Sequence, residues 1–208
     1  MDIITCEQGS EDWFRARAGI PTASEFSTIM ASGRGGGESK TRKTYMLKLA
    51  GEILTGEPME RFNNPFLDRG HAMEAEARDL YAFMADVDPE QVGFVLSGRK
   101  GCSPDALVGS AGLLEIKTKA PHLHIECLMR GEFPPDHKAQ CQGQLWVAER
   151  EWVDLAAYWP GLPLLTYRAV RDEPYIHGLS EAVDAFNAEL DAVVAQVRAY
   201  GQPLREAA

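Results

Sequence analysis

The sequence predicts a mixed α/β fold, in which a small central mixed sheet is flanked by helices. Three observations support this prediction. Apolar residues recur at helical spacing in the N-terminal part of the chain and again near its end, the centre alternates short β-prone runs with glycine turns, and the length of 208 residues fits one domain. We therefore expect a single domain over residues 1–208, without a linker or an internal repeat.

Helices are expected in six segments. Ser10 is a favourable N-cap for a short first helix, and Thr22 with Glu25 forms a capping-box pattern that opens the second. Apolar residues at helical spacing predict the longer helices further along the chain. The expected helices span residues 10–18, 22–31, 43–54, 70–84, 139–147 and 180–200.

Strands are expected in the centre of the chain, where turn signals separate short apolar runs. Gly109-Ser110-Ala111-Gly112 is such a signal, and it predicts a hairpin between the strands on either side. The glycine-rich segment 32–40 is expected to be a loop, and it lacks the Gly-Lys-Ser/Thr ending of a phosphate-binding P-loop. The expected strands span residues 92–96, 106–108, 113–118, 152–159 and 164–170.

The composition is that of an ordinary globular protein, with 45% hydrophobic and 25% charged residues. No stretch approaches the roughly 20 apolar residues of a membrane helix, and the N-terminus lacks the pattern of a signal peptide. We therefore expect a cytoplasmic protein without a membrane partner. Its four cysteines lack zinc-site spacing and are expected to be reduced structural thiols. They are Cys6, Cys102, Cys127 and Cys141.

The formal net charge of −10 is a modest objection to nucleic-acid binding, because phosphate binding usually needs a basic surface. The charges are unevenly distributed along the chain. The segment from Arg34 to Lys48 holds five basic residues and one acid, whereas residues 171–208 hold seven acids and three bases. We therefore expect a basic front that binds DNA locally and an acidic back.

The centre of the chain carries a set of residues suited to phosphodiester hydrolysis. Glu115 and Lys117 lie two residues apart, so they share one face of the expected strand, whereas Ile116 points into the core. Asp105 stands ten residues before Glu115, across the expected hairpin turn. The hairpin is therefore expected to bring two carboxylates and an ammonium group into one pocket.

This donor set suits Mg²⁺, which prefers oxygen ligands from one or two carboxylates. Asp105 and Glu115 are the expected ligands, and the backbone carbonyl of Ile116 is a further candidate. Lys117 is expected to hold the attacking water and help to remove its proton. One or two ions fit such a site, and Mn²⁺ is expected to substitute. The Glu-x-Lys pattern by itself leaves open an exposed ion pair on a hairpin edge with no catalytic role.

Several further blocks of the sequence, together with these residues, resemble the phage lambda exonuclease and YqaJ-like viral recombinase family. This family belongs to the PD-(D/E)xK nuclease superfamily, and the resemblance therefore implies a restriction-endonuclease-like core. The similarity covers roughly residues 8–160 in the same order. The blocks that carry it are Trp13 to Glu25, Arg69 to Arg78, Ser103 to Ala106, Gly112 to Thr118 and His137 to Val147.

The resemblance implies further site residues beside the central set. Glu74 matches a glutamate that reaches the metal site directly or through water. Gln142 matches a glutamine that positions the scissile phosphate or a water. Arg17, Ser24 and Ser103, together with Gln142, are implied to bind the phosphate at a DNA end, and Ser24 lies near an expected helix N-terminus, which favours anions.

The function implied by the resemblance is a 5′→3′ exonuclease that degrades one strand of linear double-stranded DNA and leaves 3′ single strands for recombination. The family also implies a phage or prophage origin, a ring-shaped homotrimer and a single-strand annealing protein as a partner. An endonuclease of the same superfamily is the alternative among enzymes. A catalytically inactive DNA-binding module and an unrelated metabolic enzyme are the alternatives from other classes.

Overall fold

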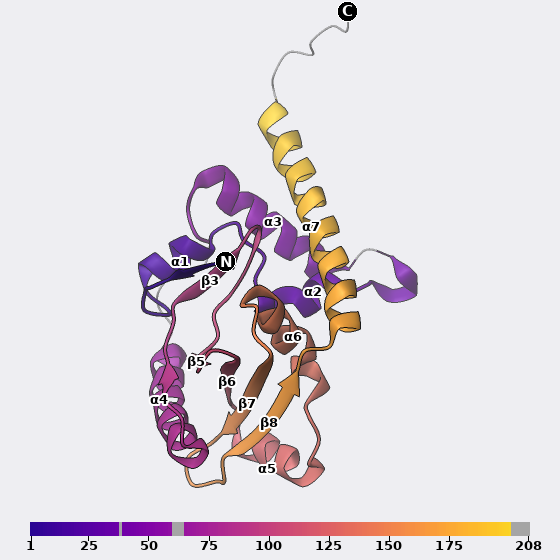
Figure 1. Cartoon of the computed structure of the whole chain (residues 1–208). Coiled ribbons are helices and arrows are strands. Elements are labelled where there is room, and N and C mark those ends of the chain that lie inside the picture. The colour runs from indigo at the N-terminus through magenta and orange to yellow at the C-terminus, as the bar shows by residue number, and fades with distance from the viewer. Residues whose placement is uncertain (38, 60–64, 201–208) are drawn as a thin grey trace, which may run out of the picture.

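The structure, a computed structural model, describes residues 1–37, 39–59 and 65–200, without the side chains of Arg34 and of residues 65–72. Its centre is a five-stranded sheet with the order β2-β5-β6-β7-β8 (Figure 1). Only the β6–β7 pair is parallel, so the sheet is mixed, as the sequence predicts. The strands are β2 (Pro89–Glu90), β5 (Ala106–Val108), β6 (Gly112–Thr118), β7 (Trp152–Tyr158) and β8 (Leu165–Val170).

A second, three-stranded antiparallel sheet has the order β1-β3-β4. Its strands are β1 (Asp2–Ile4), β3 (Phe94–Ser97) and β4 (Lys100–Cys102). β1 is not among the expected strands, because its three residues are stabilised by pairing with β3, some 90 positions away. The predicted hairpin of the larger sheet is confirmed, since β5 and β6 pair antiparallel with Ala106 opposite Leu114.

All six predicted helices are present, and several are longer than predicted. The helix α5 is additional, and both of its ends carry helix signals, with Pro121 in the first turn and Gly131 in the left-handed conformation after the last. The helical elements are α1 (Glu11–Arg17), η1 (Ala23–Glu25), α2 (Phe26–Met30), η2 (Arg34–Gly36), α3 (Lys40–Thr55), α4 (Pro65–Ala85), α5 (Pro121–Arg130), η3 (Pro135–His137), α6 (Lys138–Val147) and α7 (Glu173–Ala199).

The capping box predicted at Thr22 is absent. The side chain of Thr22 makes no cap hydrogen bond, and its hydroxyl instead lies 3.2 Å from the hydroxyl of Ser24. The reason is local geometry. The first turn, η1, is a 3₁₀ turn, so the backbone N–H of Glu25 bonds to the carbonyl of Thr22 and is not left for the threonine hydroxyl.

The larger sheet is covered on both faces, and each face packs into its own apolar cluster. Leu114 and Ile116 of β6 pack with residues of α4 on one face, which confirms that Ile116 points into the core. Leu113 packs on the opposite face with residues of α2, α3, α6 and α7. Figure 1 shows α4 and α6 on either side of β6 and β7. The side chains of β6 that share the face of Leu113 therefore point towards α6.

The close approach of η1 to α6 depends on Gly143. A Cβ atom at this position would lie 2.4 Å from the ring of Phe26 and 3.2 Å from the Cβ of Ala23. Any larger residue would push η1 away from α6. The glycine thus brings the Thr22–Ser24 turn next to the helix that covers the central site.

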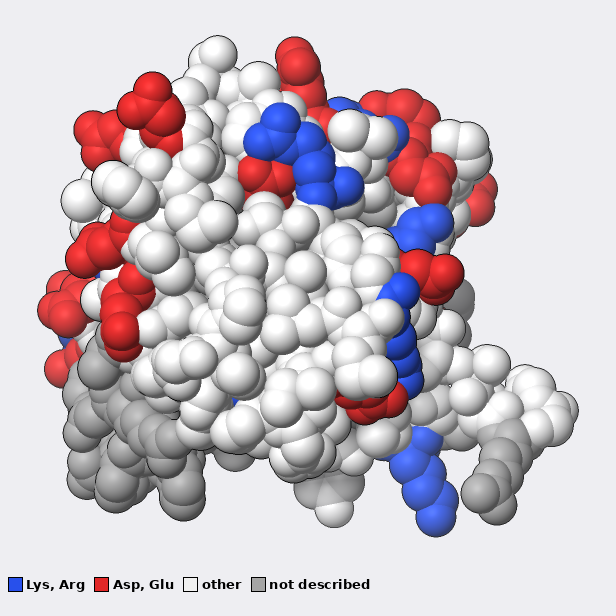
Figure 2. Space-filling view, turned by 90° about the horizontal axis from the view of Figure 1, so that it is seen from below, with Lys and Arg blue, Asp and Glu red and all other residues white. Residues whose placement is uncertain are grey.

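The predicted separation into a basic front and an acidic back is wrong where α3 meets α7. The two helices pack against each other, and Arg42 of the basic segment forms a two-pronged ion pair with Glu189, at 2.7 and 2.8 Å. Figure 2, which views the molecule from the lower end of Figure 1, shows uncharged residues over the centre of that face and charged ones around it. In the described part of the chain, no helix is long and apolar enough to cross a membrane.

Candidate active site

Asp105, Glu115 and Lys117 lie together where β5 and β6 begin to separate. The backbone N–H of Asp105 donates to the carbonyl of Leu114 at 3.0 Å, and its carboxylate accepts the N–H of Ile116 at 2.5 Å. Lys117 Nζ lies 2.7 Å from Glu115 Oε1. The hairpin therefore places the carboxylate of Asp105 beside the backbone between Glu115 and Lys117, as the sequence predicts.

Excess negative charge marks this site. Burial raises the pKa of Asp105 well above its ordinary value, and the neighbouring carboxylates of Glu115 and Glu74 raise it further. The Glu115 side chain itself is almost entirely buried, at 4% exposure. Burial acts to lower the pKa of Lys117, but the negative charges of Glu115 and Asp105 outweigh burial and raise it. Lys117 is therefore an ammonium ion here, and it offsets only part of the local negative charge.

Two glutamines of α6 complete the surroundings of Glu115. Gln140 Nε2 donates to Glu115 Oε1 at 2.6 Å, and Gln144 Nε2 donates to Glu115 Oε2 at 2.5 Å. These residues are four positions apart, so they share one face of the helix. Neutral amides hold the carboxylate in place without cancelling its charge.

The structure does not bring Gln142 to this site, which corrects the assignment made from the sequence. Its Nε2 donates to the carbonyl of Val170 at 2.8 Å, and its Oε1 accepts the N–H of Asp172 at 2.9 Å. Two residues along a helix correspond to a rotation of about 200°. Gln142 therefore faces away from Glu115 and joins α6 to the start of α7, whereas Gln140 and Gln144 are the residues that sequence reasoning missed.

Glu74 on α4 is half-buried and close enough to raise the pKa of Asp105. Among the side chains that the structure describes, no three from His, Cys, Asp or Glu lie close enough together to form a metal site by themselves. The direct or water-mediated contact of Glu74 with a metal stays a prediction.

The donor set fits a hard divalent cation. Asp105 and Glu115 offer two carboxylates beside one ammonium group. In a β-strand the N–H and C=O of one residue point to the same side, so the carbonyl of Ile116 faces the side on which its N–H meets Asp105. Two carboxylates and one carbonyl leave the remaining positions to water and phosphate, which is the usual pattern for Mg²⁺.

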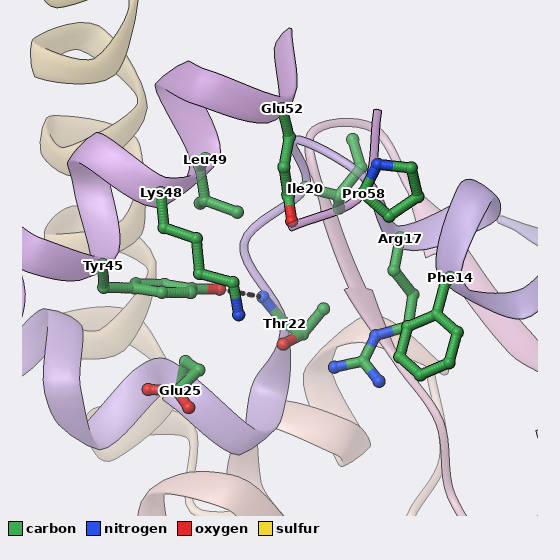
Figure 3. Close-up of a pocket in the computed structure, with 10 residues that line it drawn as sticks. All are labelled: Phe14, Arg17, Ile20, Thr22, Glu25, Tyr45, Lys48, Leu49, Glu52 and Pro58. Atoms are coloured by element: carbon green, nitrogen blue, oxygen red, sulfur yellow. Dashed lines mark hydrogen bonds between the residues drawn. The ribbon is translucent and has the colours of Figure 1, made fainter. Parts of the chain in front are cut away.

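A small polar pocket surrounds Arg17, with a volume of about 40 Å³ (Figure 3). The basic side chains of Arg17 and Lys48 and the acidic ones of Glu25 and Glu52 line it. Tyr45 lines it too, and its hydroxyl accepts the N–H of Thr22 at 3.2 Å. Figure 3 shows Arg17 and Lys48 extending from α1 and α3 into the same space. Ser24 is exposed, and it is not among the residues that line this pocket.

Trp13 links Arg17 to the segment before Asp105, a role that sequence reasoning missed. The guanidinium of Arg17 stacks 3.8 Å from the centre of the Trp13 ring. The indole N–H of Trp13 donates to the hydroxyl of Ser103 at 2.9 Å and to the carbonyl of Gly93 at 3.1 Å. The Trp13 side chain therefore holds both Arg17 and Ser103, and Ser103 lies two residues before Asp105.

The turn after Arg17 is fixed by a buried glutamate. Gly19 adopts φ +73°, which favours glycine, and its N–H donates to Glu52 Oε2 at 2.8 Å. The other oxygen of Glu52 accepts the N–H of Met59 at 3.0 Å. Glu52 thus ties the turn that carries Arg17 to the end of α3.

Comparison with known proteins identifies relatives of this chain. The YqaJ-like viral recombinase domain matches residues 12–151. An alkaline exonuclease from Laribacter hongkongensis is 32% identical, with a TM-score of 0.81 over 91% of this chain and 96% of that chain. A second structure of that enzyme, in complex with dAMP, gives the same values.

A phage-related exonuclease from Haemophilus somnus 129PT is 14% identical, with a TM-score of 0.65 over 86% of this chain and 96% of that chain. This likeness shows a shared fold. A search among curated proteins returned no match. The domain match over most of the chain and the 32% identity to an exonuclease over nearly its full length show the family. The chain belongs to the YqaJ-like viral recombinase family, within the lambda-exonuclease-like enzymes, and it is a DNA nuclease.

Proposed function

We propose that the protein is a Mg²⁺-dependent 5′→3′ exonuclease, which degrades one strand of linear double-stranded DNA. The observation that carries this proposal is the pocket of Asp105, Glu115 and Lys117, where a half-buried carboxylate, a buried one and an ammonium group meet. Its relative from Laribacter hongkongensis is an alkaline exonuclease. This relationship supports attack at DNA ends, as opposed to internal cleavage, for the present protein.

The roles of the residues follow from their contacts. Asp105, Glu115 and the carbonyl of Ile116 would hold Mg²⁺, with Glu74 reaching it directly or through water. When bound, the metal would polarise the phosphate and lower the pKa of water. Lys117 would orient the attacking water, and Gln140 and Gln144 would keep Glu115 in its ligating position.

The pocket around Arg17 is proposed to bind the terminal phosphate of the DNA. Its two basic side chains suit a phosphate, and an arginine can hold it with two parallel hydrogen bonds. Trp13 keeps Arg17 and Ser103 in fixed relation to Asp105. Ser24 would contact the same phosphate from the exposed end of η1.

Digestion of labelled DNA tests the proposal directly. Linear duplex labelled at either the 5′ or the 3′ end is incubated with Mg²⁺, Mn²⁺ or EDTA, beside a closed circular plasmid. We expect early release of the 5′ label, persistence of the 3′ label, activity with either metal and no attack on the circle. Early release of the 3′ label would contradict the polarity, and cutting of the circle would indicate an endonuclease.

We further propose that the 3′ single strands enter recombination through a single-strand annealing protein and that the nuclease assembles as a homotrimer. The viral recombinase domain supports the first statement, and the resemblance to the lambda exonuclease family implies the second. Light scattering coupled to gel filtration gives the mass of the assembly, and a monomer at micromolar concentration would contradict the trimer. Strand annealing after digestion, with and without an annealing protein, tests the role in recombination.

A further inference from the structure

A row of polar side chains extends the candidate active site beyond Lys117. Glu115, Lys117 and Lys119 follow at two-residue intervals along and just past β6. On α6 and at its start, His137, Gln140 and Gln144 are spaced at i, i+3 and i+7, so they lie along one helix face. Gln140 and Gln144 face Glu115, and His137 faces Lys119.

The contact between Lys119 and His137 is specific. Lys119 Nζ lies 3.1 Å from His137 Nε2. An ammonium group can only donate hydrogen bonds, so the imidazole nitrogen accepts, and the ring is neutral. Burial and the positive charges of Lys117 and Lys119 lower the pKa of His137 to about 4, which agrees with a neutral ring at physiological pH.

A neutral partner distinguishes Lys119 from the basic side chains that form ion pairs elsewhere in this acidic protein. Those residues are paired with carboxylates, which cancel their charge. The pairs are Arg15 with Glu11, Arg42 with Glu189, Arg99 with Asp191, Arg130 with Glu126, Lys138 with Asp172, Arg168 with Asp154 and Arg171 with Glu173.

Lys119 keeps both its charge and part of its hydrogen-bonding capacity. An ammonium group has three donors. Within the described residues, one of them is used in the hydrogen bond to His137. Lys119 is only partly buried, so its remaining donors can reach a bound molecule. The imidazole fixes the position of the side chain, and the cation remains available to an anion.

The position of Lys119 indicates which anion it meets. Two residues along an extended strand span about 6.6 Å, so Lys119 lies one such step beyond Lys117. A DNA strand whose scissile phosphate lies at Asp105, Glu115 and Lys117 carries further phosphates past that point. We propose that Lys119, held in place by His137, binds the phosphate that adjoins the scissile one on the cleaved strand. This inference rests on the proposed nuclease site, and it assigns Lys119 as a DNA-binding residue and His137 as a positioning residue.

Neutral backbone linkages in the DNA test the contact. Duplexes that each carry one methylphosphonate, at successive linkages around the cleavage site, are digested by the wild-type protein and by Lys119→Met. For the wild type we expect a loss in kcat/KM of about tenfold at the adjoining linkage, the size of a charge-assisted hydrogen bond. On unmodified DNA, Lys119→Met should lower kcat/KM by about tenfold, and a methylphosphonate at the adjoining linkage should then cause no further loss.

Matched variants separate the contact from general effects. Arg150→Met removes the same unit charge, but Arg150 bonds the carbonyl of Gly109 before β6, at the end of the strand opposite Lys119. It should leave the methylphosphonate profile unchanged. His137→Leu should weaken the response at the adjoining linkage, His137→Gln should restore it by supplying an acceptor, and His137→Leu should add nothing to Lys119→Met.

Equilibrium binding of the same duplexes by the wild type and by Lys119→Met, with Ca²⁺ in place of Mg²⁺, measures the contact without cleavage. Lys119→Met should lower the slope of log affinity against log salt by about one. A methylphosphonate profile of Lys119→Met that parallels the wild type at every linkage would overturn the contact. Absence of any metal-dependent DNA cleavage by the wild type would instead refute the proposed function. Thermal unfolding of each variant verifies that it is folded, and Lys119→Gln replaces any methionine variant that is not.

Discussion

Two buried carboxylates on neighbouring strands have opposite surroundings. Glu115 of β6 pairs with Leu155 of β7, and the residue before Leu155 is Asp154, on the other face of the sheet. Arg168 binds Asp154 through two hydrogen bonds of 2.8 Å, and the hydroxyl of Tyr81 donates to it at 2.6 Å. Glu115 instead has one ammonium group and two neutral amides, with Asp105 close by.

A buried carboxylate therefore contributes to stability on one face of the sheet and to the proposed chemistry on the other. The charge of Asp154 is fully matched by a guanidinium, and the three partners tie β7, β8 and α4 together. Around Glu115 no guanidinium of the described residues matches the carboxylates, and burial, together with the charges of Glu115 and Glu74, raises the pKa of Asp105. A buried site with excess negative charge is disfavoured until a cation binds.

Removing the cation beside Glu115 should give the largest effect on activity. We expect Lys117→Met to lower kcat by about 10³-fold, within the range for loss of a residue that positions or transfers a proton. Folding should be little changed, because Gln140 and Gln144 still bond Glu115. Single-turnover digestion and thermal unfolding measure the two quantities, and near-normal cleavage would exclude Lys117 from the reaction.

Removing the cation beside Asp154 should give the opposite result. Arg168→Met leaves a buried carboxylate with only Tyr81 as a donor, and we expect a loss of about 3 kcal/mol in the free energy of unfolding. Because Asp154 lies on the far face of the sheet, kcat per folded molecule should stay within about twofold. Denaturant unfolding checks the first value. An unstable Lys117→Met beside a stable Arg168→Met would reverse the comparison.

Gln140 and Gln142 of α6 point in nearly opposite directions and allow a further test. Gln140→Ala should reduce activity or Mg²⁺ affinity by about 10- to 100-fold, since Gln140 orients a proposed metal ligand. Gln142→Ala should instead cost about 1–2 kcal/mol of stability, because it leaves the N–H of Asp172 and the carbonyl of Val170 without a partner. Equal losses of activity in both variants would contradict the orientation of the helix.

Asp105→Asn should stabilise the metal-free protein while abolishing cleavage. The pKa of Asp105 is raised in the folded state, so the unfolded chain loses its proton first, and the wild type loses stability as pH rises above about 4. Asparagine does not ionise, and its carbonyl can still accept the N–H of Ile116.

We therefore expect the asparagine variant to be more stable than the wild type at pH 8, with the difference gone near pH 4. Mg²⁺ should raise the melting temperature of the wild type and leave that of the variant unchanged. Identical melting curves for both proteins at pH 8 without metal would show that Asp105 carries no electrostatic penalty.

Local sequence patterns were enough to predict the residues of the central pocket and the helices with clear apolar periodicity. Asp105, Glu115 and Lys117 follow from local rules, because a strand alternates its faces and a hairpin returns the chain beside itself. The register of β5 and β6 then brings them together with few alternatives. The short strands β1 and β2 could not be predicted in this way, since their stability comes from distant partners.

Only the tertiary structure decided which face of α6 meets Glu115. Seven of the ten residues of this helix are buried, so its pattern does not mark one inward face. The contact of Gly143 with Phe26 and the attachment of Gln142 to the start of α7 set its rotation, and that rotation presents Gln140, Gln144 and His137 to β6. A strand carries its face in its own alternation, whereas the orientation of a helix buried on several sides is set by the elements that pack around it.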